Sequence, residues 1–399
     1  MLSNPPSPPF RKGGNIYYLF FFILTLTAYP CPSNASNLFK YHQVAMGTVI
    51  EITLIGDDEE AANKAVLQAF QEIKRIETLM SPWLDSSDVT RINRSAGKEW
   101  VNPVRNSSGA LNPVRDLSLN GINPALRGGT PYGAEPGIIL KSNPAAEQRG
   151  IISNGVKVSP ETMEVIKKAK EISELSEGGF DITVGPLTEL WRKAREKKTP
   201  PSVEEVKGKL SLVNFKNIET DQEGKVFLKK KGMAIDLGGI AKGYAVDRAF
   251  EFLKSLRYKN LIVNAGGDLR VGGFKNNQPW SIGIQNPRES QKILARISIS
   301  DTAVATSGDY EKYFIYQGKR YHHIFNPKDG FPTEGSQSVT IIAKDCITAD
   351  GLATAVFVLG AEKGYSLCQK LEGVDCLIVD QEGKIIISPG LKDRIAFGP

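Results

Sequence analysis

The stretch AIDLGGIAKGYAVD, which runs from Ala234 to Asp247, decides the fold that we expect for the rest of the chain. Its first residues are apolar, as at the end of a buried strand, and after Asp236 and two glycines the apolar residues recur at helical spacing. Backbone N–H groups at such a turn point outward at the positive end of the helix dipole, which suits a phosphate, and Lys242 adds a positive charge. A plain glycine-rich connection has the same pattern, and neither the P-loop nor the G-x-G-x-x-G motif is present.

Composition places the chain among ordinary globular proteins. Of its 399 residues, 41% are hydrophobic and 24% are charged. The net charge of +6 is modest and no long basic run is present, so we expect no binding to nucleic acid. The length allows two or three average domains, but strands and helices mix without strict βαβ alternation. This mixture predicts the α+β class with one large domain that contains mixed or antiparallel sheets and packed helices.

The N-terminal residues predict an export signal. Arg11 and Lys12 precede a short apolar run over residues 16–28, and small residues follow up to Ala35. We therefore assign residues 1–35 to a signal peptide and residues 36–399 to the domain. A retained N-terminal anchor is the alternative, and lipidation at Cys31 is disfavoured by the preceding Pro30.

The remaining cysteines are expected to be small core residues. Cys346, Cys368 and Cys376 are odd in number and lack C-x-x-C spacing, which argues against a disulfide framework and a zinc site.

Periodicity predicts the order of elements along the domain. A long amphipathic helix is expected over residues 59–80. Further helices are expected over residues 159–176 and 348–358, a hairpin around residues 317–319, and strands over residues 40–54, 226–228, 234–235, 261–264, 280–285, 295–300, 338–343, 375–380 and 384–388.

A repetitive segment interrupts this order at about residues 102–150. NPVR occurs at Asn102 and again at Asn112, and NPALR follows at Asn123. The segment is rich in Asn, Pro, Gly, Ser and Arg and has little apolar periodicity, which is typical of an inserted, mobile surface segment. We assign no function to it.

Three further groups of residues have the chemistry of a site. Trp83, just past the end of a helix, is either a core plug or an aromatic shelf for a planar ligand, and its position alone favours the plug. Asp350 and Thr354 are four residues apart on a predicted helix, so their oxygens share one face, as Mg²⁺ ligands do, although a polar pair at a helix start is the commoner case.

His323, before Asn326-Pro327, is a candidate general base or a structural hydrogen-bonding residue. Zinc is disfavoured because no His-x-x-x-His spacing or cysteine partner accompanies it. A Ser-His-Asp hydrolase would use Ser307, but the G-x-S-x-G elbow is absent.

The motifs together form an ordered set over nearly the whole domain. They are Met46-Gly47-Thr48, GGFDITVGPLTELW, IDLGGIAKGYAVD, VNAGGD, ATSGDYEKYF, RYHHIFNPKDGFP and ADGLAT with Asp350 and Thr354. This set resembles the ApbE family, the FAD:protein FMN transferases of the bacterial periplasm. The resemblance covers about residues 40–390, apart from the repetitive segment.

The resemblance implies a T-fold-related α+β domain that holds FAD across its site with one Mg²⁺ near the diphosphate. It places the metal ligands at the Asp350 and Thr354 side chains and the Gly239 carbonyl. The implied FAD contacts are Met46, Trp83 (where relatives often have Tyr), Gly179, Phe180, Asp181, Asp236, Lys242 and Phe325. The implied catalytic residues are Lys242, which neutralises phosphoryl charge, and His323 or Asp309, which takes the proton of an attacking hydroxyl.

The resemblance thus implies Mg²⁺-dependent transfer of FMN from FAD to a Ser or Thr hydroxyl, with AMP as the second product. The implied acceptors carry a D-G-x-x-[ST]-G-A-T-like motif and belong to membrane redox pumps or other flavin-carrying extracytoplasmic proteins. The enzyme would be periplasmic, or tethered to the inner membrane through its N-terminus. An FAD pyrophosphatase that forms FMN and AMP, and a non-catalytic periplasmic flavin-binding protein, are the alternatives.

Overall fold

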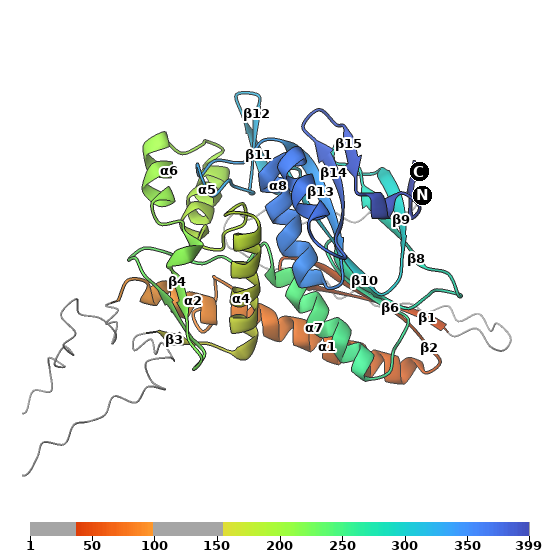
Figure 1. The fold of residues 1–399 in the computed structure, drawn as a ribbon. Coiled ribbons are helices and arrows are strands. Elements are labelled where there is room, and N and C mark those ends of the chain that lie inside the picture. The colour runs from red at the N-terminus through yellow and green to blue at the C-terminus, as the bar shows by residue number, and fades with distance from the viewer. Residues whose placement is uncertain (1–36, 99–154, 399) are drawn as a thin grey trace, which may run out of the picture. The chain divides into compact units, whose positions relative to one another are not determined.

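An eight-stranded antiparallel sheet forms the centre of the structure, a computed structural model that describes residues 37–98 and 155–398 (Figure 1). The predicted signal peptide and the predicted insert lie outside the described residues and stay predictions. In spatial order the strands are β1 (Asn37–Ala45), β2 (Thr48–Gly56), β6 (Leu261–Ala265), β7 (Asp268–Gly272), β10 (Thr302–Gly308), β13 (Ser336–Ala343), β14 (Asp375–Asp380) and β15 (Ile385–Ile387).

Both faces of this sheet are covered, because its apolar residues alternate between two cores. Val263 of β6 and Ala305 of β10 belong to the core beneath the helices, whereas their neighbours Ile262 and Val304 belong to or pack against the second core. Every residue of β13 is buried, as expected for a strand at the centre of a sandwich. The sequence-based prediction of an α+β fold with antiparallel sheets is confirmed.

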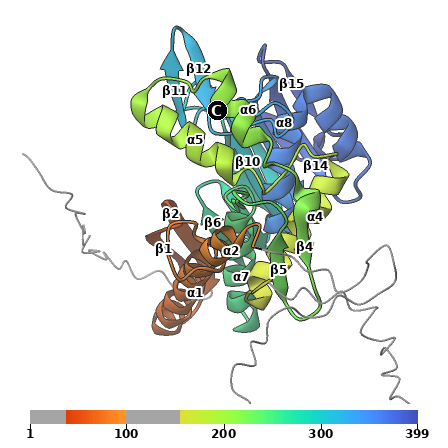
Figure 2. The same ribbon diagram turned by 90° about the vertical axis from the view of Figure 1, so that its left-hand side faces the viewer.

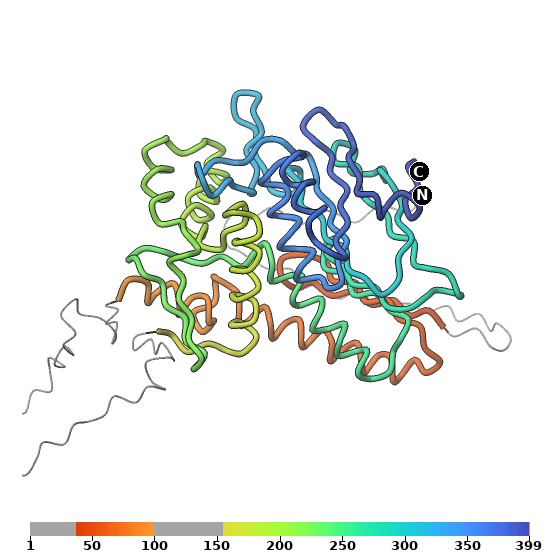
Figure 3. The backbone as a smooth tube through the Cα atoms, in the orientation of Figure 1, coloured from red at the N-terminus to blue at the C-terminus, as the bar shows by residue number. Residues whose placement is uncertain are grey.

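Helices cover one face of the sheet. The helix α1 packs on β1 and β2, α7 packs on β6 and β7, and α8 packs on β10, β13 and β14. Figure 3 traces how α1 and α7, which are far apart in the sequence, run beside each other below the sheet. The helices of the described residues are α1 (Glu59–Met80), α2 (Asp88–Ser95), α4 (Pro160–Leu175), α5 (Gly185–Lys197), α6 (Val203–Leu210), α7 (Ala241–Ser255) and α8 (Cys346–Gln369), with short 3₁₀ turns η1 (Phe215–Asn217) and η2 (Pro389–Leu391).

The opposite face carries a three-stranded sheet of β8 (Trp280–Gln285), β9 (Ile293–Ile299) and β16 (Ile395–Phe397). Trp280 and Ile297 from this sheet pack with Val271 and Leu377 of the large sheet. A second small sheet contains β3 (Val156–Lys157), β5 (Lys225–Leu228) and β4 (Ile218–Thr220).

A third, smaller core forms a lobe beside the sandwich. The hairpin of β11 (Tyr313–Tyr316) and β12 (Lys319–His322) lies near α5 and α6 in Figure 2. Trp191 of α5, Val206 of α6 and Phe314 of β11 are buried together in this lobe.

The helix predicted over residues 59–80 is confirmed at both ends. The Asp58 carboxylate accepts a hydrogen bond from the Ala61 N–H and so caps the first turn.

The three cysteines Cys346, Cys368 and Cys376 are buried and free, as expected. None of the helices among residues 37–98 and 155–398 combines the length and the apolar character needed to span a membrane.

Two strand predictions are wrong. Residues 40–54 form two strands, because Met46 and Gly47 adopt positive φ values of 53° and 72° and make a two-residue hairpin turn. This turn normally carries Asn-Gly or Asp-Gly, so Met-Gly gave no turn signal. Ala234 makes only an isolated parallel bridge with Val184 and does not extend a sheet. The predicted strand-to-helix turn is therefore a loop-to-helix turn.

The contact between α7 and α8 depends on a glycine, which leads to a prediction about stability. A Cβ at Gly243 would collide with the Cys346 carbonyl oxygen and lie 2.8 Å from the Asp350 Cβ. Because backbone atoms cannot move aside cheaply, Gly243→Ala is expected to lower the free energy of unfolding by about 1–3 kcal/mol in urea denaturation.

The matched control is Gly208→Ala on α6, where no atom lies within 4 Å of the added Cβ. This exposed position is expected to gain up to about 1 kcal/mol from the higher helix propensity of alanine. Equal effects of the two substitutions would contradict the close approach of α7 to α8.

Candidate functional site

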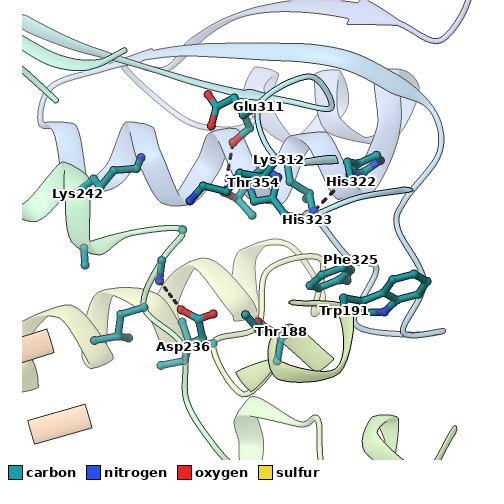
Figure 4. A pocket seen from close by; sticks show the side chains of 18 of the residues that line it. Thr188, Trp191, Asp236, Lys242, Glu311, Lys312, His322, His323, Phe325 and Thr354 are labelled. Atoms are coloured by element: carbon teal, nitrogen blue, oxygen red, sulfur yellow. Dashed lines mark hydrogen bonds between the residues drawn. The ribbon is translucent and has the colours of Figure 1, made fainter. Parts of the chain in front are cut away.

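A cleft of about 500 Å³ lies between the sandwich and the smaller lobe. It is lined by the β1–β2 turn, the end of α1, the loops before α5 and α7, β10, the hairpin region and α8. Every predicted site residue except Asp309 lines it. Figure 4 shows Lys242, Glu311 and Thr354 toward one end, and Phe325 and Trp191 toward the other.

The glycine turn after Asp236 forms one wall of the cleft. The Asp236 N–H donates to the Ile182 carbonyl (2.7 Å), and the Asp236 Oδ1 accepts from the Gly238 N–H (2.8 Å). These bonds hold the turn that leads into α7, whose first residue is Ala241. The N-cap residue Ile240 makes no side-chain cap, and in the first turn the Ala241 N–H donates to the Leu237 carbonyl and the Gly243 N–H to the Asp350 carboxylate. The positive end of the helix dipole thus lies at the cleft wall. A phosphate at this position stays a prediction.

The three residues predicted to hold a metal lie together. Asp350 and Thr354 are one turn apart on α8, and a Cβ placed on Gly239 would lie 3.1 Å from the Thr354 Oγ1. Thr354 Oγ1 is also 3.3 Å from the Ser307 Oγ. Within the described ranges no group of three or more His, Cys, Asp and Glu side chains is placed to hold a metal. The predicted ligand set differs from such a group, because it combines one carboxylate with a hydroxyl and a backbone carbonyl.

The donor chemistry and the charge around Asp350 fit a hard divalent cation. Asp350 is only 4% exposed, and burial raises the pKa of its carboxyl to about 7 against the opposing effect of Lys242. One oxygen accepts from the Gly243 N–H (2.9 Å), and the other is 4.0 Å from the Lys242 Nζ. A buried carboxylate with so few partners is stabilised by a cation, and oxygen ligands of these kinds suit Mg²⁺.

Lys242 is surrounded by acidic groups. Its Nζ contacts the Oδ2 of Asp268, the first residue of β7. Burial alone would lower the pKa of Lys242, but Asp268 and Asp350, with a smaller effect of Glu311, raise it above the usual range. Lys242 is therefore a fixed positive charge at the cleft wall.

The two adjacent histidines have different environments. His322 is buried, its Nε2 lies 2.8 Å from the Thr333 carbonyl oxygen, and its Nδ1 lies 3.3 Å from the Ile324 N–H that donates to it. These bonds give His322 a structural role. His323 lines the cleft, and among the described residues its buried Nδ1 has no hydrogen-bond partner. Burial and the nearby Lys312 lower the pKa of His323 to about 3, so its imidazole is neutral at physiological pH.

The aromatic side chains divide into one exposed and one buried group. Trp83 is 66% exposed at the cleft, and the Arg192 guanidinium lies 5.4 Å from the centre of its ring. The interpretation of Trp83 as a core plug is therefore wrong, and the shelf remains. Phe325 is buried and stacks on Trp191, with ring centres 5.8 Å apart.

Asp181 lines the cleft, but its carboxylate supports the surrounding loops. Its Oδ1 accepts from the Thr183 N–H (2.7 Å) and hydroxyl (2.6 Å), and its Oδ2 accepts from the Phe215 N–H (2.8 Å). Gly179 and Phe180, which precede it, also line the cleft, and Phe180 packs next to Gly239. A direct contact of the Asp181 carboxylate with a ligand would require these bonds to be exchanged.

Asp309 is separated from the cleft lining. Its carboxylate accepts from two guanidinium groups, those of Arg288 (2.7 and 2.9 Å) and Arg320 (3.0 Å). Because its oxygens are already paired and Asp309 does not line the cleft, its predicted role as a proton acceptor gains no support.

The sequence interpretation missed several polar residues at the cleft. Glu311 and Lys312, within the ATSGDYEKYF motif, line it, and Glu77 of α1 accepts a hydrogen bond from the Met46 N–H (3.0 Å). The last contact holds Met46 at its positive φ. Glu311 and Lys312 belong to a quoted motif, so their place in the order of motifs was the available signal. Glu77 gave no signal, because its position in the sequence is that of an ordinary helix residue.

Ser307 contacts Thr354 and has no histidine partner in the described part of the chain, so the hydrolase interpretation gains no support.

Comparison with known proteins places this geometry in a family. The model of the ApbE family matches residues 46–117 and 139–378. A relative from Klebsiella pneumoniae, an FAD:protein FMN transferase, is 29% identical over 367 residues, which are 91% of this chain and 95% of the relative. A second FAD:protein FMN transferase, from Vibrio cholerae, is 37% identical over 218 residues, or 53% of this chain and 65% of that protein.

Solved structures agree with the sequence comparison. The crystal structure of the ApbE protein of Thermotoga maritima superposes with a TM-score of 0.70 at 32% identity and covers 90% of this chain and 99% of that one. The flavin transferase ApbE of Vibrio cholerae superposes with a TM-score of 0.67 at 25% identity, over 90% of this chain and 100% of that one.

The neutral His323 leads to a prediction about pH. Its folded-state pKa of about 3 is below the ordinary value of 6.5, so the unfolded chain binds the proton more readily. The stability contributed by the neutral imidazole is fully present above about pH 6.5 and is lost as the pH falls toward 3. The free energy of unfolding of the wild type should therefore fall more steeply in acid than that of His323→Gln, by at most about 1.4 kcal/mol per pH unit.

Urea denaturation at a series of pH values measures this difference. His42→Gln, which removes an exposed imidazole from β1, is the matched control. Parallel curves for the wild type and His323→Gln would contradict a buried, neutral His323.

Proposed function

This chain belongs to the ApbE family, and we propose that it is an FAD:protein FMN transferase that joins FMN to a Ser or Thr hydroxyl of an acceptor protein and releases AMP, with Mg²⁺ as the metal. The observation that carries the proposal is that Asp350, Thr354, Lys242 and the backbone at Gly239 line one end of a single cleft. An aromatic face, Trp83, lines the same cleft and suits a flat ring system.

The charged end of the cleft suits the diphosphate of FAD. Lys242 and the positive end of the α7 dipole supply positive charge where phosphoryl oxygens would lie. Because these groups are held by the fold before the substrate binds, they stabilise developing charge without reorganisation. A bound Mg²⁺, held by Asp350, Thr354 and the Gly239 carbonyl, would neutralise further phosphate charge.

The proposed transfer needs no reactant besides FAD and the acceptor hydroxyl. The hydroxyl oxygen of the acceptor attacks the phosphorus of the FMN half, and the bond from that phosphorus to the bridging oxygen breaks. AMP leaves with the bridging oxygen, and the hydroxyl proton passes to the neutral imidazole of His323. His323 suits this role because it lines the cleft and its Nδ1 has no hydrogen-bond partner among the described residues. The phosphoester that forms joins FMN to the acceptor.

The N-terminal residues support an extracytoplasmic location. Arg11 and Lys12 before the apolar run of residues 16–28 are typical of an export signal. We infer that the enzyme meets acceptor proteins outside the cytoplasm, either released or tethered to the inner membrane through its N-terminus.

A transfer assay tests the function. The full chain is incubated with FAD, Mg²⁺ and an acceptor that carries a D-G-x-x-[ST]-G-A-T motif, and the acceptor is examined for in-gel flavin fluorescence while nucleotides are separated by chromatography. Flavin-labelled acceptor with an equal amount of AMP is expected. AMP and FMN without labelled acceptor would indicate a pyrophosphatase, and tight FAD binding without AMP would indicate a flavin-binding protein. Both outcomes would overturn the proposal.

The metal site leads to a prediction about Asp350. Asp350→Ala removes the carboxylate ligand, so FMN transfer is expected to fall by about 100-fold or more while part of the FAD binding remains. Initial rates of acceptor labelling and fluorescence titration of FAD measure the two effects. Glu362→Ala, on an exposed part of α8, is the control and is expected to leave the rate unchanged. Full transfer activity in Asp350→Ala would show that the metal is held elsewhere.

A further inference from the structure

We infer that Asp268 is a positioning residue that holds Lys242 away from Asp350 and thereby keeps the Asp350 carboxylate available to the divalent cation. The inference rests on the proposed function, because it concerns the cation site of that cleft. Asp268 is 2% exposed and is not among the residues that line the cleft, whereas Lys242 and Asp350 both line it. Asp268 therefore touches the cleft only through its contact with Lys242, and its charge also acts on Asp350.

Lys242 lies between two carboxylates and pairs with one of them. Its Nζ contacts the Oδ2 of Asp268 but lies 4.0 Å from the Oδ1 of Asp350, which is at the limit of an ion pair. A lysine side chain is a point charge on a flexible stem, so a small movement would bring it onto Asp350. The contact with Asp268 is what opposes that movement.

The two carboxylates cannot follow the lysine, because both sit on rigid elements. Asp268 begins β7 directly after the tight Gly266-Gly267 turn and is paired with Ala265 of β6. Asp350 is fixed on α8 by the hydrogen bond from the Gly243 N–H of α7 (2.9 Å). The position of Lys242 between them is therefore decided by the balance of the two attractions.

The number of charges explains why this balance affects metal binding. One lysine can neutralise one carboxylate, and the pairing with Asp268 leaves the second oxygen of Asp350 without an ion pair closer than 4.0 Å. If the charge at position 268 were removed, Lys242 would pair with Asp350 and compete with the cation for the same oxygen. Glu311 also acts on Lys242 through its charge, but no ion pair joins the two side chains in the described residues.

The test compares Asp268→Asn with Glu311→Gln in the full chain. Both substitutions remove one nearby negative charge and keep the side-chain shape, but only Asp268 contacts Lys242. Mn²⁺ is the probe in place of Mg²⁺, and the electron paramagnetic resonance signal of free Mn²⁺ measures its binding. Asp268→Asn is expected to weaken Mn²⁺ binding by about tenfold or more, whereas Glu311→Gln changes it by less than about threefold.

A double variant separates positioning from loss of charge. In Asp268→Asn with Lys242→Met, the competing ammonium is gone, so Mn²⁺ affinity is expected to return to at least that of the wild type. Lys242→Met alone is expected to bind Mn²⁺ no more weakly than the wild type. This measurement on the single variant tests the inference even if Asp268→Asn does not fold. Thermal unfolding of each variant verifies that the chain is folded.

The outcomes distinguish this inference from the proposed function. Unchanged Mn²⁺ binding in Asp268→Asn, or a double variant that stays weak, would overturn the role of Asp268 and leave the metal site intact. Weaker binding in Lys242→Met alone would also overturn it. Absence of Mn²⁺ binding by the wild type, with and without FAD, would overturn the metal site itself and the inference with it.

Discussion

The contact between the start of α7 and the start of α8 is the constraint on which the site depends. Gly243 has no side chain, so the two helices approach until its N–H reaches the Asp350 carboxylate, and Cys346 lies against it. This approach brings a helix N-terminus, a lysine and a carboxylate that are about a hundred residues apart in the sequence to one end of the cleft. A bulkier residue at position 243 would separate the helices and the charges together.

The sandwich makes this contact rigid. The large sheet buries apolar residues on both of its faces, and α7 and α8 are packed against neighbouring strands on one face. The tight β6–β7 turn on the same sheet supplies Asp268 behind Lys242. The electrostatics of the cleft are thus built from backbone positions that cannot relax independently, which is the arrangement that stabilises charge most effectively.

The cleft has two chemically different ends because two cores meet there. The sandwich supplies the carboxylates, the hydroxyls and Lys242, whereas the smaller lobe supplies Phe325 and Trp191. His323 lies between these groups, directly after β12. A substrate that has both a diphosphate and flat rings would match both ends, which supports the proposal of FAD over a simple phosphate.

By itself, the sequence determined the elements whose signals are local. The α1 helix was predicted to the residue because its periodicity is local, and the motif order identified the family, whose implied site residues all line the cleft except Asp309. Only the tertiary structure decided that Trp83 is exposed, that Asp309 is held by two arginines, and that Asp268 pairs with Lys242. These facts depend on which distant residues become neighbours. Burial and charge pairing are set by such contacts, and spacing along the chain does not encode them.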